Sequence, residues 1–501
     1  MIARNTLLNL MGQALPLFVG ALALPVAFRG LGPERFGILS LAWMLLGYFS
    51  LADLGLGRAI TKYSAEALAR RDVTALPAVV HAGIALLLLL GLVAAIGLSL
   101  IAPLLASRIF VIPPGLKDEA NRMFNQLALL MPFAVMIPGL RGVLEADQRF
   151  DLVNLIRATT NALLFALPAL GAVLGWSLDA LVSGLLVVVA GSFLVTGWAV
   201  VRRHPVLLRF SHIDGEWVRK LLGFGGWLII PNILFPVLLH VDRFFLGAFY
   251  SVSTVGYYTV AHEMVLRLWI VPSSAAMALF PAFAALSSAD AERTALLFAR
   301  ATKYLVFIMG LGAILVILLA PEILRVWMGP DVAEAGTWAL RVLTVGIAVN
   351  AGTWVAYSFL QGMGRTASIA KAYLVELPLR VISAWLLVTH FALLGAATAW
   401  SFWLLLDALF FAYVARRTLP AIGPALTATG FPWTVVLLGV VTTAGFSVYL
   451  LPIPPAVQAM GSLALAAAVV VLAWRRIFDY TETESVFAQI RRILIPNTWP
   501  A

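Results

Sequence analysis

Residues 78–105 read AVVHAGIALLLLLGLVAAIGLSLIAPLL, a run without a single Asp, Glu, Lys or Arg. A membrane-spanning helix needs about 20 consecutive apolar residues, so this run is long enough to cross a bilayer. The whole chain has the same character: of its 501 residues, 62% are hydrophobic and only 12% are charged. Because soluble proteins carry about 25% charged residues, a soluble enzyme, a disordered chain and a nucleic-acid-binding domain all fit poorly. The absence of cysteine excludes disulfides and thiolate metal sites.

Runs of this kind predict an all-α integral membrane protein with about 14 transmembrane helices. The expected spans are 7–28, 36–57, 78–105, 123–146, 153–174, 180–201, 221–241, 254–285, 303–320, 336–361, 367–389, 393–414, 431–451 and 456–474. The eighth is long enough to tilt or to extend past the bilayer.

The distribution of Lys and Arg predicts the orientation, because cytoplasmic loops carry an excess of these residues. With a cytoplasmic N-terminus, 24 of the 34 Lys and Arg residues fall in cytoplasmic loops and 8 in outside loops. Arg267 and Arg380 make up the remainder and lie within predicted spans. We therefore expect both termini in the cytoplasm, and we read the net charge of +10 as a topology signal.

The chain nearly repeats itself at a shift of about 215 residues. Pro16 corresponds to Pro231, and Leu31-Gly32 corresponds to Leu246-Gly247. Two weaker matches have nearly the same shift: 144–149 with 360–365, and 155–158 with 369–372. Six spans separate the copies, so both have one orientation. Parallel repeats about an axis along the membrane normal are a recurrent transporter design.

The repeat predicts two six-helix lobes, with the default substrate site in a central cavity between them. The expected domains are an N-terminal lobe at 1–203, a C-terminal lobe at 204–415, two further helices at 416–475 and a cytoplasmic tail at 476–501. A duplicated structural bundle without transport is the alternative, although such a bundle needs neither two similar halves nor buried charge.

Several short motifs resemble those of a known family. The first half contains LGPERFG at 31–37 and DLGLGR at 53–58. The second half contains VDRFFLG at 241–247, VGYY at 255–258 and WMGP at 327–330. Over roughly residues 5–415, the chain resembles the Wzx-type oligosaccharide flippases. These form the polysaccharide-transport branch of the multidrug/oligosaccharidyl-lipid/polysaccharide exporter superfamily.

This resemblance implies a non-enzymatic carrier in the bacterial cytoplasmic membrane. Members move undecaprenyl-diphosphate-linked oligosaccharides from the inner to the outer leaflet by alternating access, for O-antigen, capsule or exopolysaccharide synthesis. They do not hydrolyse ATP, and the chain has no GxxxxGK[ST] phosphate loop. The expected partners are the lipid-linked oligosaccharide, membrane lipids, a coupling H⁺ or Na⁺ and polysaccharide polymerase machinery. No cofactor, metal or nucleic acid is expected.

Three pairs of opposite charges lie within predicted spans at i,i+4 spacing: Arg141/Glu145, Glu263/Arg267 and Glu376/Arg380. A buried ionisable group costs about 2.5–3.5 kcal/mol on insertion scales, so it usually faces a partner or a cavity. Each pair either neutralises itself or offers its guanidinium group, which suits a diphosphate, to the substrate. Arg267 and Arg380 are expected near the bilayer midplane, and Arg141 nearer the cytoplasmic end.

Other charges lie at the ends of predicted spans, and each has two interpretations. Asp53 and Arg58, at the cytoplasmic end of the second span, form either a local helix cap or part of an inner gate. Asp242 and Arg243, at the outer end of the seventh, form either an interfacial anchor or an outer-gate pair, in which Arg243 could contact the diphosphate late in the cycle.

One further carboxylate, Asp407, lies within the twelfth predicted span. It either carries a coupling ion or pairs with another helix.

Three other functions compete with the flippase. A cation or proton-coupled multidrug antiporter of the same superfamily is disfavoured, because residues 7–28 contain no charge. A lipid II flippase is a closer relative and stays open. A membrane glycosyltransferase or glycan polymerase needs a sizeable loop with acid/base side chains, but the longest outside loop, near 106–122, offers only the adjacent Asp118 and Glu119 as carboxylates.

Overall fold

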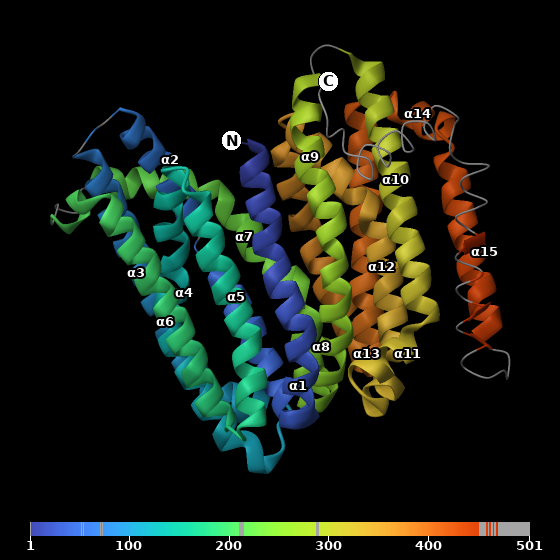
Figure 1. The fold of residues 1–501 in the computed structure, drawn as a ribbon, viewed down its shortest axis with the longest axis horizontal. Coiled ribbons are helices and arrows are strands. Elements are labelled where there is room, and N and C mark those ends of the chain that lie inside the picture. The colour runs from blue at the N-terminus through green and yellow to red at the C-terminus, as the bar shows by residue number, and fades with distance from the viewer. Residues whose placement is uncertain are drawn as a thin grey trace, which may run out of the picture. The chain divides into compact units, whose positions relative to one another are not determined.

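The structure of the chain is a computed structural model. It describes residues 2–449, apart from 52, 54, 71, 73, 210–214 and 287–289, together with a few residues between 457 and 468. Within these residues every regular element is a helix. The order is α1 Ile2–Leu51, α2 Leu56–Ala69, α3 Ala75–Leu104, α4 Lys117–Ala146, α5 Phe150–Val173, α6 Leu178–Arg203, α7 Gly215–Phe249, α8 Val252–Leu266, α9 Ile270–Leu286, α10 Ala291–Leu318, α11 Ala320–Trp327, α12 Pro330–Gly362, α13 Thr366–Thr418, α14 Ile422–Ala428 and α15 Phe431–Tyr449 (Figure 1).

Two long elements are pairs of helices joined at a turn. Gly32 (φ 74°) interrupts α1, and Ala392 (φ 48°) interrupts α13. Each turn lies between two spans expected from the sequence. At the second turn the chain is so tight that a side chain on Gly395 would overlap the carbonyl of Leu387. Gly395 has to be glycine there, because the close backbone approach leaves no room for a Cβ.

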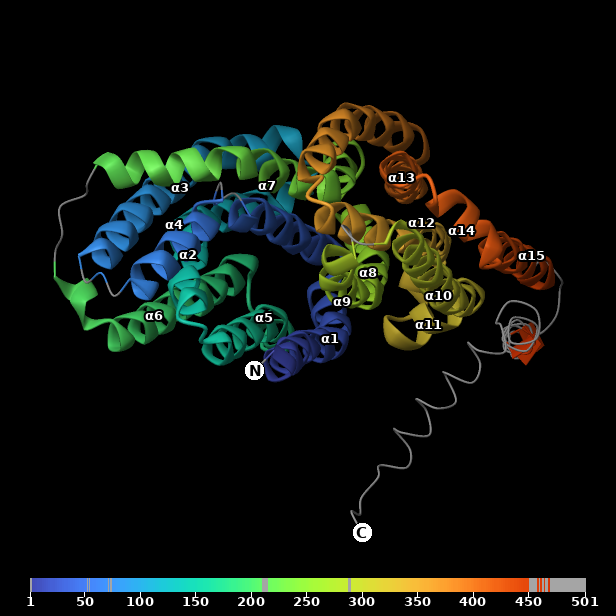
Figure 2. The ribbon, with the colours of Figure 1, turned by 90° about the horizontal axis from the view of Figure 1, so that it is seen from above.

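The chain divides into two compact units, described here separately. Unit 1 comprises Met1–Ala261 and Tyr373–Trp400. Its α4 packs against α2, α3 and α6, while α1 packs against α5 and α7 (Figure 2). A core of buried aliphatic side chains, among them Ile60, Val143 and Leu221, fills one end of this bundle.

Unit 2 comprises His262–Ala372 and Ser401–Ala501. Its α12 packs against α9, α10 and α11, and α10 also contacts α14 and α15. Arg341 on α12 is buried and donates a hydrogen bond from Nε to the carbonyl oxygen of Ile317 on α10, at 3.0 Å. The division into predicted lobes at 1–203 and 204–415, two further helices at 416–475 and a tail at 476–501 stays a prediction.

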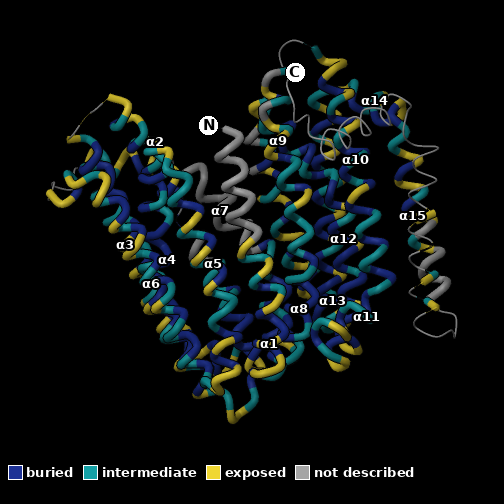
Figure 3. Tube along the Cα trace, viewed as in Figure 1, coloured by how far each residue is buried: buried dark blue, intermediate teal, exposed yellow. Residues whose placement is uncertain are grey.

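The helices have the hydropathy of a multi-pass membrane protein. Among the described residues, nine helices are long and apolar enough to span a bilayer, or ten if the bent pair α14 and α15 forms one span. Large apolar side chains are exposed along the middle of α3, such as Leu89, Val93 and Ile96, and exposed segments recur along that helix (Figure 3). In a bilayer these side chains would face lipid. The all-α membrane fold is thus confirmed; the count of 14 stays a prediction, and the span at 456–474 lies largely outside the described residues.

The structure also shows a helix that hydropathy did not predict. Residues 58–77 were expected as a cytoplasmic loop, but α2 occupies most of them. One face of α2 is buried, including Ile60 and Ser64, whereas Lys62 and Glu66 form an i,i+4 ion pair on the other. Because α2 has apolar residues on one face and polar residues on the other, it contains no continuous apolar run, and hydropathy alone does not predict it.

Candidate functional site

Arg380 and Asp242 form a wholly buried ion pair in unit 1. The Nε of Arg380 donates to the carbonyl oxygen of Leu238 on α7 at 3.1 Å. Its other guanidinium nitrogen lies 3.6 Å from Asp242 Oδ1, and both side chains have no exposed surface. The hydroxyl of Tyr258 on α8 donates to the second carboxylate oxygen of Asp242. Buried charges persist in a protein when they are paired and hydrogen-bonded, as these are.

Two more of the predicted charges are buried in the same unit. Arg243, next to Asp242 on α7, is 1% exposed, and Glu376, one turn before Arg380 on α13, is 4% exposed. The structure therefore surrounds these groups with protein. Their predicted roles, diphosphate contact for Arg243 and Arg380 and gating for Asp242 and Glu376, stay predictions.

A second cluster joins α2, α4 and α5. The carboxylate of Glu145 interacts electrostatically with Arg141, then Arg157, then Arg58, in decreasing order. Arg141, Glu145 and Arg157 are half-buried, and Arg58 is exposed. Arg157 also donates a 2.8 Å hydrogen bond to the side-chain oxygen of Asn154. All three arginines lie within electrostatic range of Glu145, and Arg58 also lies within range of Asp53. Three guanidinium groups against these two carboxylates leave one excess positive charge, which suits an anion. The arginine cluster below means Arg58, Arg141 and Arg157.

Glycines bring the helices of this cluster together. A Cβ on Gly142 would lie 2.6 Å from Thr61 Oγ1 and 2.8 Å from the carbonyl oxygen of Gly57, so α4 and α2 touch through their backbones. Arg141 and Arg58 are the immediate neighbours of these two glycines. The close contact fixes the starting points of both arginine side chains.

Asp53 caps the start of α2. Its two carboxylate oxygens each accept a 3.0 Å hydrogen bond, one from the backbone N–H of Gly55 and one from that of Gly57. Such bonds satisfy backbone donors that a helix start leaves without partners. Of the two interpretations of Asp53, the geometry supports the local cap; its gating role, and that of Arg58, stay predictions.

Arg267 lies in a short 3₁₀ segment, Arg267–Trp269, that separates α8 from α9 in unit 2. Its side chain is half-buried, and Glu263, one turn earlier, is its electrostatic partner. The electrostatic influence agrees with the i,i+4 spacing, and the role of the pair in transport stays a prediction. A tightened segment inside a spanning helix often marks a functional hinge.

Asp407 contacts a neighbouring helix of unit 2. Its Oδ2 accepts a 2.8 Å hydrogen bond from the side-chain amide of Asn350 on α12. The same amide nitrogen lies 3.2 Å from Thr353 Oγ1 and 3.4 Å from the carbonyl oxygen of Leu404. Both Asp407 and Asn350 are buried. Asp407 thus has the interhelical partner that one of its two interpretations expects. Its role in carrying a coupling ion stays a prediction.

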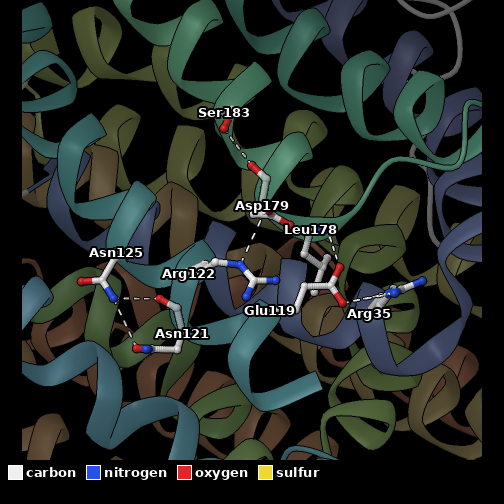
Figure 4. A network of polar contacts seen from close by, with 8 residues as sticks. All are labelled: Arg35, Glu119, Asn121, Arg122, Asn125, Leu178, Asp179 and Ser183. Atoms are coloured by element: carbon white, nitrogen blue, oxygen red, sulfur yellow. Dashed lines mark hydrogen bonds and ion pairs between the residues drawn. The ribbon is translucent and has the colours of Figure 1, made fainter. Parts of the chain in front are cut away.

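One network was not anticipated from the sequence. Glu119, 7% exposed, accepts hydrogen bonds from Arg35 at 3.1 and 3.3 Å and from the backbone N–H of Leu178 at 2.7 Å (Figure 4). Arg122 lies 3.9 Å from Asp179 beside it (Figure 4). The carboxylate ties α1, α4 and α6 together. The sequence analysis assigns Glu119 to the outside loop near 106–122, whereas the structure places it in the first turn of α4. A loop carboxylate gives no signal for its partners on other helices.

Another ion pair lies outside the spans at the opposite end of α4. Asp147 pairs with Arg203, and the ring of His204 lies 3.8 Å from the same carboxylate. Burial lowers the pKa of His204 below its ordinary value, more strongly than Asp147 raises it. His204 is therefore neutral at pH 7, and Arg203 is the charge that pairs with Asp147.

Taken together, the structure groups the predicted site residues into four places. Unit 1 holds Asp242, Arg243, Glu376 and Arg380 in one region and Asp53, Arg58, Arg141 and Glu145 in another. Unit 2 holds the Glu263/Arg267 pair and, separately, Asp407. The sequence reading did not single out Arg157, Tyr258 or Asn350 as members of these groups.

Comparison with protein families agrees with the fold. The family model described as "Polysaccharide biosynthesis protein" matches residues 2–287, more than half of the chain. The chain belongs to this family. The model described as "MatE" matches residues 228–386. A relative from Shigella flexneri, named "Putative O-antigen transporter", is 26% identical over 418 residues, covering 83% of this chain and 98% of the relative.

Solved structures share the fold. An inward-facing multidrug resistance MATE family transporter of the MOP superfamily matches with a TM-score of 0.69 at 17% identity, over 83% of this chain and 99% of that one. The lipid II flippase MurJ, in an inward closed conformation, matches with a TM-score of 0.68 at 13% identity, over 93% of this chain and 99% of that one. The similar proteins are transporters and flippases, not enzymes, so this member of the polysaccharide biosynthesis family is a multi-pass membrane transporter.

Proposed function

We propose that the chain is a flippase for undecaprenyl-diphosphate-linked oligosaccharide. It moves this substrate from the inner to the outer leaflet of the bacterial cytoplasmic membrane by alternating access, for surface polysaccharide synthesis. Family membership and the similarity to the O-antigen transporter relative support the class of cargo. The observation that carries the proposal is the arginine cluster, whose three guanidinium groups outnumber the carboxylates of Glu145 and Asp53 beside them.

The chemistry of the cluster suits a diphosphate. A guanidinium group binds phosphate oxygens through two parallel N–H donors, and such charge-assisted bonds are roughly twice as strong as neutral ones. Partial burial of Arg141 and Arg157 strengthens their attraction for an anion, because fewer water molecules screen it. The charge count predicts that this end of α4 lies at the cytoplasmic face, where the headgroup would enter.

The remaining arginines would act later in the cycle. Half-buried Arg267 offers a second binding position for the diphosphate, at the start of the hinge-like 3₁₀ segment. Arg380 and Arg243 reach a diphosphate only after the packing around Asp242 opens, because both are enclosed in the present state. Asp242, Glu263 and Glu376 then balance the charges that the substrate leaves behind.

Transport against a gradient needs a driving force, and Asp407 is the proposed carrier. Asp407 is a buried carboxylate that accepts a hydrogen bond from the Asn350 amide, and this amide also reaches the Thr353 hydroxyl and the Leu404 carbonyl oxygen. Such a carboxylate within a span offers a place for H⁺ or Na⁺. The membrane potential is the alternative. The polyprenyl tail remains in lipid, and polymerase machinery receives the flipped glycan.

Paired substitutions test the arginine cluster. Losing one charge-assisted hydrogen bond costs about 1.5–3 kcal/mol, which corresponds to roughly a tenfold to hundredfold loss of affinity. We expect Arg141→Ala and Arg157→Ala to lower glycan export by that order, and Arg141→Lys to restore part of it. Arg149→Ala is the matched control, because Arg149 pairs locally with Asp151 at 2.7 Å. The measurement is mass spectrometry of lipid-linked glycans that accumulate on the cytoplasmic leaflet.

The same measurement separates the alternatives. Accumulated lipid II in depleted cells would assign the chain to peptidoglycan precursors. No accumulated lipid-linked glycan, together with drug sensitivity, would favour the multidrug antiporter that the MatE match suggests. Export that survives both alanine variants at normal protein levels would contradict the role of the arginine cluster.

A further inference from the structure

In unit 1, α1 and the first part of α8, up to Ala261, touch through their backbones. A Cβ on Gly37 of α1 would overlap the carbonyl oxygen of Val252 at the start of α8. A Cβ on Gly256 of α8 would lie 2.6 Å from the carbonyl oxygen of Pro33. Both glycines are buried. The two helices can be this close only because neither glycine carries a side chain.

Aromatic side chains pack around this contact. Phe28 lies 5.1 Å from Phe36 and 5.8 Å from Tyr257, measured between ring centroids. Phe36 has no exposed surface and Phe28 only 6%. The space beside the glycines is therefore filled by rings from both helices.

Backbone hydrogen bonds reinforce the same end of the unit. The N–H of Val111, in the segment after α3, donates to the carbonyl oxygen of Gly247 at 2.7 Å. The N–H of Val252 donates to the carbonyl oxygen of Val111 at 3.3 Å. The segment after α3 is thus tied to the turn between α7 and α8. Val111, Gly247 and Val252 lie in loops or at helix ends, and the charge count predicts that this end of the unit faces the outside of the cell.

The numbering of these contacts relates them to the internal repeat. A shift of 215 assigns position 37 to position 252, so Gly37 touches its own equivalent. By the same shift, position 33 corresponds to position 248 and position 256 to position 41. The contact between 33 and 256 therefore predicts an equivalent contact between 248 and 41. A Cβ on Gly247 would lie 3.4 Å from Leu41 Cδ1, one residue from that expectation. In a twofold arrangement a residue meets its own equivalent only at the axis.

We propose that Gly37 and Gly256 form the outer gate of the transporter, closed in this structure by direct backbone contact on the repeat axis. The inference rests on the proposed function, because a cavity between the two predicted lobes opens outward only if the helices at the axis separate. Glycine lets the gate close without a gap. The backbone bonds of Val111 break on opening and are replaced by bonds to water at the outer surface.

A bulky residue at either glycine holds this gate open. We expect Gly37→Leu and Gly256→Leu to abolish export. The matched control is Gly97→Leu in α3, because a Cβ on Gly97 has no neighbour within 4 Å. Gly97→Leu retains export.

Opening of the gate is measured by the labelling of an introduced cysteine. Because the chain contains no cysteine, no native thiol has to be removed first. Ser40→Cys places a thiol on α1 one turn beyond Gly37, at a position with no exposed surface. An open state populated at up to about 10% becomes dominant when closure is blocked, so Gly37→Leu and Gly256→Leu should each raise maleimide labelling of the purified protein about tenfold or more. Ser64→Cys, buried in α2, stays unlabelled and shows that the fold is intact.

Two results would contradict the proposed gate. One is normal export from Gly37→Leu; the other is labelling of Ser40→Cys that is no faster when combined with Gly37→Leu or Gly256→Leu than when combined with Gly97→Leu. The labelling arm needs no glycan substrate. A wrong substrate assignment therefore leaves its outcome unchanged, and failure of the gate is distinguishable from failure of the proposed function.

Discussion

At the scale of single residues, the ion pair between Arg380 and Asp242 combines stability with a proposed role in transport. Removing one partner of a buried pair leaves an uncompensated charge and costs about 3–5 kcal/mol. We expect Arg380→Ala to lower the melting temperature of the detergent-solubilised protein clearly. The double variant Arg380→Met/Asp242→Asn removes both charges and recovers most of that loss, because a nearly isosteric apolar side chain can fill the space.

The double variant also separates the two roles of Arg380. If the arginine contacts the diphosphate during the cycle, export stays lost although the fold is restored. Recovered export in the double variant would restrict the pair to a structural role and remove Arg380 from the substrate path.

At the scale of elements, Glu119 holds three helices together. Glu119 belongs to α4. Its carboxylate accepts hydrogen bonds from the Arg35 side chain of α1 and from the first backbone N–H of α6. Glu119→Gln keeps the shape but removes the charge, and bonds to charged groups contribute about 1.5–3 kcal/mol each. We expect a lower melting temperature for Glu119→Gln than for Asp118→Asn, its chain neighbour. Equal melting temperatures for the two variants would show that the network in Figure 4 contributes little.

Hydropathy predicted the long elements because their apolar runs are local properties of the sequence. It missed α2, whose exposed Lys62 and Glu66 interrupt the apolar pattern. The pairing of Asp242 with Arg380 was not predicted, because the i,i+4 rule finds only partners on the same helix, such as Glu376. The predicted Glu376/Arg380 pair stays a prediction. Contacts between helices far apart in the chain depend on packing, which no single stretch encodes.

At the scale of the whole molecule, the repeat and the packing divide the chain differently. The repeat predicts a boundary near residue 203, whereas unit 1 also takes in residues up to Ala261 and Tyr373–Trp400. Two contacts help to join Tyr373–Trp400 to unit 1. Arg380 donates a hydrogen bond to the carbonyl oxygen of Leu238 on α7, and the Tyr250 hydroxyl donates one of 2.9 Å to the carbonyl oxygen of Thr389. A sequence repeat reflects a duplication of the chain, whereas a compact unit reflects which helices pack together in one conformational state. The two boundaries therefore need not coincide.

The charge-derived topology is a property of the whole molecule and predicts which loops face which side. Gly115 is exposed in the loop expected outside, and Ala69 is exposed in the segment expected in the cytoplasm. Because the chain has no cysteine, Gly115→Cys and Ala69→Cys each introduce a single thiol. In intact spheroplasts a membrane-impermeant maleimide should label Gly115→Cys alone, and Ala69→Cys should react only after permeabilisation. The reverse pattern would invert the topology, and with it the placement of the arginine cluster at the entrance and of Gly37 and Gly256 at the exit.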